Sequence, residues 1–207
     1  MIHFFVRARC DDMEMKTQLA SCSDFFDAQN SDYSLPRWND LPDIELYMDQ
    51  VITLLNKYIE NFSLEGEVLL TPSMINNYVK HGIIPSPNKK RYSRVHLARL
   101  IIICIMKPVL PISSIAQLLE NLLKTRTDQQ VFDYFSEHYE YTFSDIMKVL
   151  RRYSENSNAD DLDISAMLSL TVMHAAAVSG GSKLLAQKAL VEIDKIENDG
   201  MAKHGKG

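Results

Sequence analysis

The sequence predicts an all-α fold. After about residue 40, apolar side chains recur at spacings of three and four, which is the pattern of helices that bury one face. Glycine and proline are sparse, with seven of each in 207 residues, and this favours helices over a turn-rich β fold. A hydrophobic content of 46% with 24% charged residues is typical of a globular chain, long enough for one large domain or two small ones.

The N-terminal part, residues 1–37, is rich in Asp, Ser and Asn and lacks steady periodicity, so we predict a poorly ordered lead-in. Trp38 follows it and is expected to staple this lead-in onto the body. The clearest helix is predicted over 41–62, because nine apolar residues in that stretch lie at helical spacing. Pro42 suits its first turn, where a missing N–H costs nothing.

Residues 71–82 predict a short helix with both ends marked. Thr71 suits the N-cap, Pro72 the first helical position, and Gly82 the left-handed residue beyond the end. The following residues, 86–92, predict a turn with cations at its tip.

A longer helix is predicted from the N-cap Ser93 to about Lys107. Its second half, residues 100–106, is apolar on every side, so this helix is expected to form the buried centre of the unit. After a break at Pro108 and Pro111, residues 112–123 predict an amphipathic helix that closes a domain over 38–124.

Residues 125–207 are predicted as a C-terminal helical module for dimerisation or effector binding. Its expected segments are two aromatic-rich helices over 131–153 that meet near Tyr141, a polar loop over 154–163, a helix over 164–178, and an amphipathic helix over 182–196. We expect an interruption at Gly180-Gly181 and a frayed tail from Asn198. Aromatic side chains at helical spacing form either a small ligand pocket or plain core, and both alternatives stay open.

One stretch stands out by its charge. Residues 68–119 contain seven Lys and Arg residues and no Asp or Glu, although the whole chain has a net charge of −5. A locally positive field in an acidic protein suits a phosphate backbone, and the acidic flanks favour a single docking face. The alternative is a chance run on a solvated face.

The order of elements in this stretch is that of a helix-turn-helix with a wing, in which the second helix lies in the major groove and the wing adds phosphate contacts. Residues 71–81 would then be the groove helix. Met74, Ile75 and Tyr78 are expected to face inward. The predicted groove contacts are Ser73, Asn76, Asn77 and Lys80. The predicted phosphate and wing contacts are Tyr78, Lys89, Lys90, Arg91, Tyr92 and Arg94.

Several runs resemble known families. Residues 75–84, Ile-Asn-Asn-Tyr-Val-Lys-His-Gly-Ile-Ile, are similar to the MerR-type pattern Leu-Arg-Tyr-Tyr-Glu-x-x-Gly-Leu-Leu, Arg91-Tyr92-Ser93 resembles the exit of the MerR wing, and residues 112–119 resemble the helix that closes that domain. Residues 41–51 and 74–82 look like the bacterial domain of unknown function 1836. The resemblance covers about residues 38–124 and implies a MerR-like winged helix-turn-helix that binds DNA.

The chain departs from the MerR pattern at definite positions. Asn76 stands where MerR proteins have the base-reading Arg, and Asn77 where they have the first Tyr, while Tyr78 and Arg91 match. The wing is shorter than a typical MerR wing, Pro111 replaces the Ser cap of the closing helix, and no metal-sensing cysteines follow.

We therefore expect a cytoplasmic transcriptional regulator that binds double-stranded DNA as a homodimer, with a seam in the C-terminal helices, such as residues 182–196. Intramolecular core is the alternative for that stripe. The alternative function is a protein-protein interaction module whose basic face docks an acidic partner. An excisionase-like role in DNA architecture is a further possibility.

An enzyme is not expected, because the six histidines are scattered and no nucleophile or phosphate-loop motif occurs. No cofactor or metal site is expected either. Three cysteines without CxxC spacing favour a reducing compartment, and the longest apolar run, 100–106, is too short for a membrane span.

Overall fold

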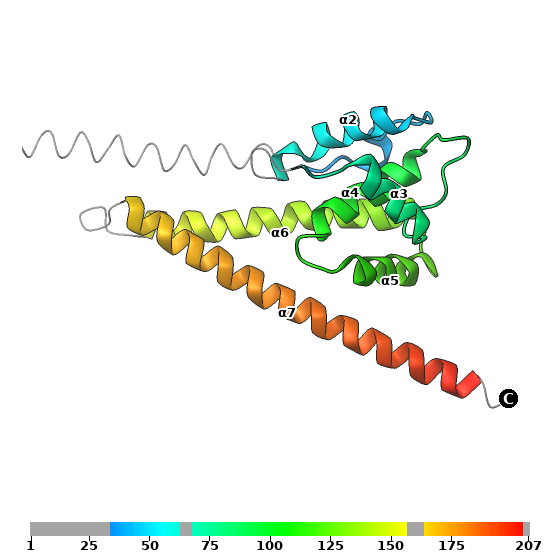
Figure 1. Ribbon diagram of the computed structural model, residues 1–207. Coiled ribbons are helices and arrows are strands. Elements are labelled where there is room, and N and C mark those ends of the chain that lie inside the picture. Colours follow the sequence, from blue (N-terminus) through cyan, green and yellow to red (C-terminus); the bar gives the residue numbers. More distant parts are fainter. Residues whose placement is uncertain (1–33, 63–67, 157–163, 205–207) are drawn as a thin grey trace, which may run out of the picture. The chain divides into compact units, whose positions relative to one another are not determined.

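The computed structural model describes residues 34–62, 68–156 and 164–204 of the chain, and it confirms the all-α prediction. Within these ranges there is no strand, only two isolated β-bridges. The elements in order are η1 (Trp38–Asp40), α2 (Met48–Ile59), η2 (Glu60–Phe62), α3 (Pro72–Lys80), α4 (Arg94–Met106), α5 (Ile112–Leu123), α6 (Asp128–Asn156) and α7 (Ile164–His204) (Figure 1). None of the described helices combines the length and the apolar character that crossing a membrane requires.

The chain divides into two compact units. One unit, called the core unit here, comprises residues 35–139 and 179–207, and the second comprises residues 1–34 and 140–178. The division therefore runs through α6 and α7. The core unit holds α2 to α5, the first part of α6 and the C-terminal part of α7, and it contains all the residues of the candidate site.

Helix α4 is the centre of the core unit, as the apolar run over 100–106 predicts. Its buried residues occur at consecutive positions from His96 to Cys104, Arg99 alone excepted, so almost its whole circumference is enclosed. Helices α2 and α5 both contact α4. They contribute Val51, Leu55 and Ile59 from α2 and Ile115 and Leu119 from α5 to the same hydrophobic core.

The predicted start of the first long helix was wrong. Helix α2 begins at Met48, not near residue 41, because Leu46 is held in an extended backbone pair with Tyr92. The Leu46 N–H donates to the Tyr92 carbonyl at 2.9 Å, and the Tyr92 N–H donates back at 2.8 Å. Ile44 and Tyr47, two of the nine apolar residues at helical spacing in this stretch, are 67% and 52% exposed. A pairing with a distant residue here overrides the local helical pattern.

The lead-in predicted over residues 1–37 falls mostly on residues 1–33, which lie outside the described ranges, as do the loop residues 63–67 and 157–163. The last residues of the lead-in pack against the core unit. Leu35 is buried, the Ser136 hydroxyl donates to the Pro36 carbonyl at 3.1 Å, and the Trp38 N–H donates to the Asp133 carboxylate at 2.8 Å. Trp38 thus staples the chain onto α6, as predicted.

Two predicted breaks in the C-terminal part are wrong. Helix α6 continues through Tyr141, and α7 continues through Gly180 and Gly181 to His204, beyond the expected fraying at Asn198. Each glycine costs a helix roughly 1 kcal/mol relative to alanine. The flanking residues are mostly good helix formers, so a long helix tolerates that cost.

Candidate nucleic-acid interface

Helix α3 forms as its end signals predict. The Thr71 hydroxyl accepts the Met74 N–H at 3.2 Å, which satisfies one of the free donors of the first turn, and Pro72 occupies the first position. Ile75 and Tyr78 are buried against the core. The helix is therefore fixed by one face, and its opposite face is left to solvent.

The exposed face of α3 carries the four residues predicted to face a DNA groove. Ser73, Asn76, Asn77 and Lys80 are all exposed, and their spacing places them on one stripe along the helix. Within the described part of the chain, neither Asn76 nor Asn77 makes a side-chain hydrogen bond. Their amides present donors and acceptors outward.

The exit of α3 is also as predicted. Gly82 has φ +70°, a left-handed conformation that glycine adopts without a steric penalty. The Tyr78 carbonyl then accepts the Ile83 N–H at 2.9 Å, and Ile83 and Ile84 are buried. The chain leaves the helix anchored to the core, so the next segment starts from a fixed point.

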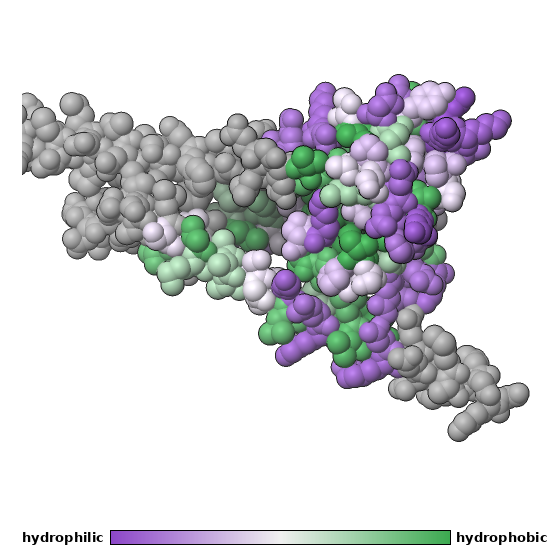
Figure 2. All heavy atoms as spheres, viewed as in Figure 1, coloured by the Kyte–Doolittle hydropathy of each residue, from purple (hydrophilic) through white to green (hydrophobic). Residues whose placement is uncertain are grey.

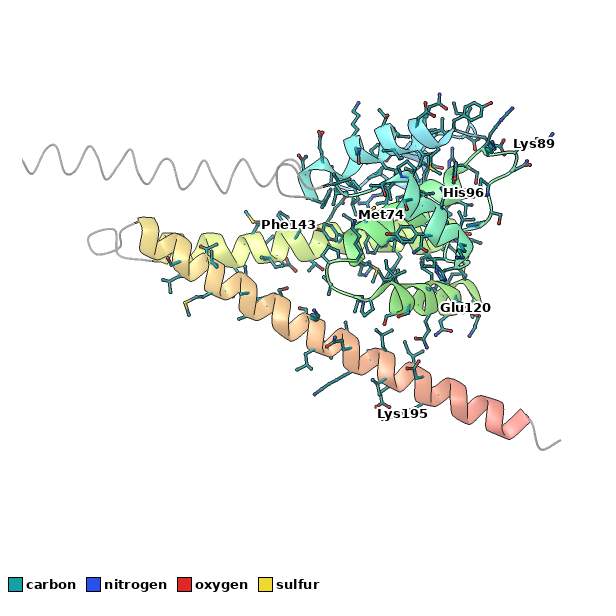
Figure 3. The ribbon with its side chains drawn as sticks, viewed as in Figure 1. Met74, Lys89, His96, Glu120, Phe143 and Lys195 are labelled. Atoms are coloured by element: carbon teal, nitrogen blue, oxygen red, sulfur yellow. The ribbon has the colours of Figure 1, made fainter. Side chains whose placement is uncertain are left out.

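The connection to α4 ends in a tight turn from Asn88 to Arg91. The Arg91 N–H donates to the Asn88 carbonyl at 2.8 Å, and the two central residues, Lys89 and Lys90, have φ of 48° and 63°. Two consecutive positive φ values are the mark of a type I′ turn, which normally takes Asn-Gly. For lysine, the left-handed conformation costs roughly 1–2 kcal/mol at each position. Lys89 projects outward at the tip of this turn (Figure 3).

The base of the turn is held by its neighbours. Tyr92, which pairs with Leu46, is buried, and the Arg91 guanidinium lies 5.7 Å from the centre of the Tyr47 ring. This cation–π contact orients Arg91 and leaves it exposed. The sequence predicted a helix over 41–62, which includes Tyr47, so the contact of Tyr47 with Arg91 was missed.

Two of the predicted phosphate contacts need correction. Tyr78 and Tyr92 are only 4% and 3% exposed, and burial raises the pKa of both hydroxyls above 10.0. Buried rings do not offer a surface to DNA. Both tyrosines instead hold α3 and the turn in place.

Three of the seven cations of the basic stretch are engaged inside the core unit. Arg94, predicted as a phosphate or wing contact, lies 3.4 Å from the Asp43 carboxylate, and its guanidinium lies 5.7 Å from the centre of the Trp38 ring, so it already has partners within the core unit. Arg99 pairs with Asp128 at 2.6 Å. Lys107 donates to the Leu69 carbonyl at 2.5 Å.

The other four cations remain available. Lys80, Lys89, Lys90 and Arg91 are exposed, and within the described residues none of them forms an ion pair. Hydrophilic side chains gather at the end of the core unit that carries the turn (Figure 2). The site thus combines two amides and a hydroxyl on a helix with four cations that have no carboxylate partner within the described residues, at the end of that helix and on the turn.

His96 stabilises the residues that follow the turn, Tyr92 and Ser93. It is buried, its Nδ1 accepts the Ser93 N–H at 2.9 Å, and its ring meets the Tyr92 ring edge-on at 5.3 Å. Burial lowers the pKa of His96 below 6.5. Its position three residues after the N-cap Ser93, where capping boxes have Glu or Gln, was the signal for its role.

We predict that His96 makes the protein less stable in acid. Its folded-state pKa lies below that of the unfolded chain, so the unfolded state takes up a proton first, and stability falls as the pH drops below about 6.5. His96→Gln keeps the capping acceptor and removes the titration. Urea unfolding at pH 7 and pH 5 should show a smaller loss of unfolding free energy in the variant than in the wild type. Equal losses would contradict this role.

Comparisons with known proteins give one match, which is to a family model. No curated protein and no solved structure matches the chain. The model of the family described as Domain of unknown function (DUF1836) matches residues 36–143, which is more than half of the 207 residues and runs from just before Trp38 into the second half of α6. The chain belongs to this family.

Proposed function

We propose that the chain is a DNA-binding transcriptional regulator, with α3 in the major groove and the 88–91 turn on the flanking phosphates. The observation that carries the proposal is a set of exposed cations without an ion-pair partner among the described residues, Lys80, Lys89, Lys90 and Arg91, beside a stripe of outward amides. Phosphate contacts supply affinity and register, while hydrogen bonds to base edges supply specificity. Asn76 and Asn77 would read bases, since an Asn amide pairs in two-pronged fashion with adenine.

The charge distribution supports one docking face. Asp43, Glu45 and Asp49 lie on either side of Leu46 in the sequence, and because Leu46 pairs with Tyr92, these acids bound the positive surface on that side. In a chain with a net charge of −5, DNA approaching from elsewhere meets repulsion. A protein of this kind would act in the cytoplasm.

The proposed architecture is a MerR-like winged helix-turn-helix in which the connection that precedes the groove helix α3 is longer than usual. Residues 60–71 connect α2 to α3, which is longer than the three- or four-residue turn of a standard helix-turn-helix. The likeness therefore rests on α3, the tight turn, α4 and α5. The turn is the short wing, and its reach is limited to its two lysines and Arg91.

A dimer belongs to this proposal. Helix α3 has nine residues and presents four side chains to a groove, which is a small number of contacts for a monomer to bind DNA tightly. Two copies related by a twofold axis would double the contacts and read a palindromic site.

One observation favours the alternative of a protein-docking module. Ile44 and Tyr47 are exposed next to the turn, in a segment that also carries acids. Exposed apolar groups beside cations suit a protein partner with an acidic, partly apolar surface. Base reading depends on the amides of Asn76 and Asn77, whereas docking of an acidic protein depends mainly on the cations.

Binding to random duplex DNA should weaken steeply with salt. Four phosphate contacts give a slope of log K against log salt of about −3 to −4, lower than the −4 to −5 expected when about five cations of the stretch touch DNA. A Lys89→Ala, Lys90→Ala, Arg91→Ala variant should lose about 2 to 3 units of slope, measured by fluorescence anisotropy between 50 and 200 mM salt.

The matched control removes three exposed lysines elsewhere, Lys57, Lys148 and Lys183, and so changes the net charge equally. It should retain the wild-type slope. An equal loss in the control would show that only net charge matters, and no binding by the folded wild type at 50 mM salt would exclude the DNA proposal.

Asn76→Ala should reduce specificity rather than general affinity. On a duplex selected from a random library, the loss of a two-pronged contact should cost about 1–3 kcal/mol, or roughly 5- to 150-fold in Kd. On random duplex the affinity should stay unchanged, and Asn56→Ala on α2 serves as the control. If no sequence is enriched, or if Asn76→Ala binds both duplexes like the wild type, base reading by this residue is refuted.

A further inference from the structure

The C-terminal part of α7 has one face on the core unit and another that is open. Ala186 and Leu190 pack against the hydrophobic core, and the Gln117 amide on α5 donates to the Asp194 carboxylate. Leu185 and Ile196, on an adjacent face, are each 70% exposed. Hydrophobic side chains lie on the surface of α7 between hydrophilic ones (Figure 2).

The open face has a symmetric pattern. Leu185, Ala189, Glu192 and Ile196 follow one another at spacings of four, three and four, which keeps them on one line along the helix. Read in reverse, the spacing is the same. Two copies of this line can therefore be placed antiparallel so that large residues meet large ones at both ends.

We propose that this line of α7 is the seam of a homodimer, formed with the same line of a second copy around a twofold axis that passes between Leu190 and Val191. In this register Leu185 packs on Ile196 of the second copy, and Ile196 packs on its Leu185. The two contacts are equivalent, as an interface between identical copies requires.

The charges favour the antiparallel arrangement. A parallel pair would place Glu192 directly against its own copy and bury two like charges together. In the antiparallel register Glu192 lies opposite the small Ala189, with its carboxylate free to reach the rim, where it already pairs with Lys195 at 2.7 Å. Lys188 of one copy then approaches Glu192 of the other.

The same charges argue for a second copy as the occupant. Lys188 and Lys195 flank Glu192 on this side of α7, and in the antiparallel register the Lys188 of each copy lies near the Glu192 of the other, so the rim is self-complementary. Such a rim has no preference for DNA or for an anionic membrane. The seam spans only twelve residues, 185–196, about 16 Å along the helix, and a dimer this small should dissociate on dilution.

This seam rests on the proposed function, because it specifies the interface of the dimer proposed there, and it can be tested without DNA. Sedimentation velocity across a range of concentrations should show the wild type approaching twice 23.7 kDa at high concentration. Ile196→Lys and Leu185→Glu should each remain monomeric. Val191→Lys should dimerise like the wild type, because Val191 is also exposed, at 52%, but lies about a third of a turn from the seam.

Mixing the two monomeric variants tests the orientation. In the antiparallel register, the introduced glutamate at 185 faces the introduced lysine at 196 of the other chain, so a mixture of Leu185→Glu and Ile196→Lys should recover dimers. A mixture that stays monomeric would overturn the antiparallel register. A wild type that is monomeric at every concentration, or an Ile196→Lys variant that still dimerises, would overturn the seam itself.

The outcome is separable from DNA binding. A monomeric Ile196→Lys variant should still bind random duplex with the salt slope of Val191→Lys, since its α3 and turn are unchanged. It should lose only the additional affinity that a dimer has for a palindromic duplex. A wild type that dimerises and does not bind DNA would leave the seam intact and refute the proposed function alone.

Discussion

The burial of α4 is the constraint on which the rest of the structure depends. Charged groups are costly to bury without a partner, and on this helix Arg94 and Arg99 are paired with Asp43 and Asp128. These pairs decide which part of the basic stretch remains positive. The remaining positive charge of the stretch lies at the end of α3 and on the 88–91 turn, where the cations have no carboxylate partner within the described residues.

The same packing fixes the geometry of the exposed groups. The bridge between Leu46 and Tyr92, the buried Tyr78 and the capping contact of His96 hold α3 and the turn on the core. Lys89 and Lys90 occupy a conformation that would suit Asn-Gly better. Strain of this kind is retained where the surroundings determine the backbone, and at functional sites it holds side chains in place for binding. A rigid display of two lysines would reduce the entropy lost on binding phosphate.

Local signals allowed much of this to be predicted. The cap at Thr71, the left-handed Gly82 and the apolar run in α4 were read correctly because each depends on neighbouring residues. The start of α2 was misplaced because Leu46 pairs with a residue far along the chain. The burial of Tyr92 and the internal pairing of Arg94 and Arg99 were missed for the same reason, since only the tertiary structure brings their partners near. The breaks expected in α6 and α7 overestimated what two glycines and an aromatic cluster do to a long helix.

The central claim is that α3 and the 88–91 turn form the surface that meets DNA. Lysine footprinting tests it most directly: the protein is acetylated with and without duplex DNA, and the modified lysines are quantified by mass spectrometry. DNA should protect Lys80, Lys89 and Lys90 from acetylation, while the exposed Lys57 and Lys148 should react equally in both samples. Equal reactivity of all five lysines under conditions in which DNA is bound, or protection of Lys57 and Lys148 alone, would contradict it.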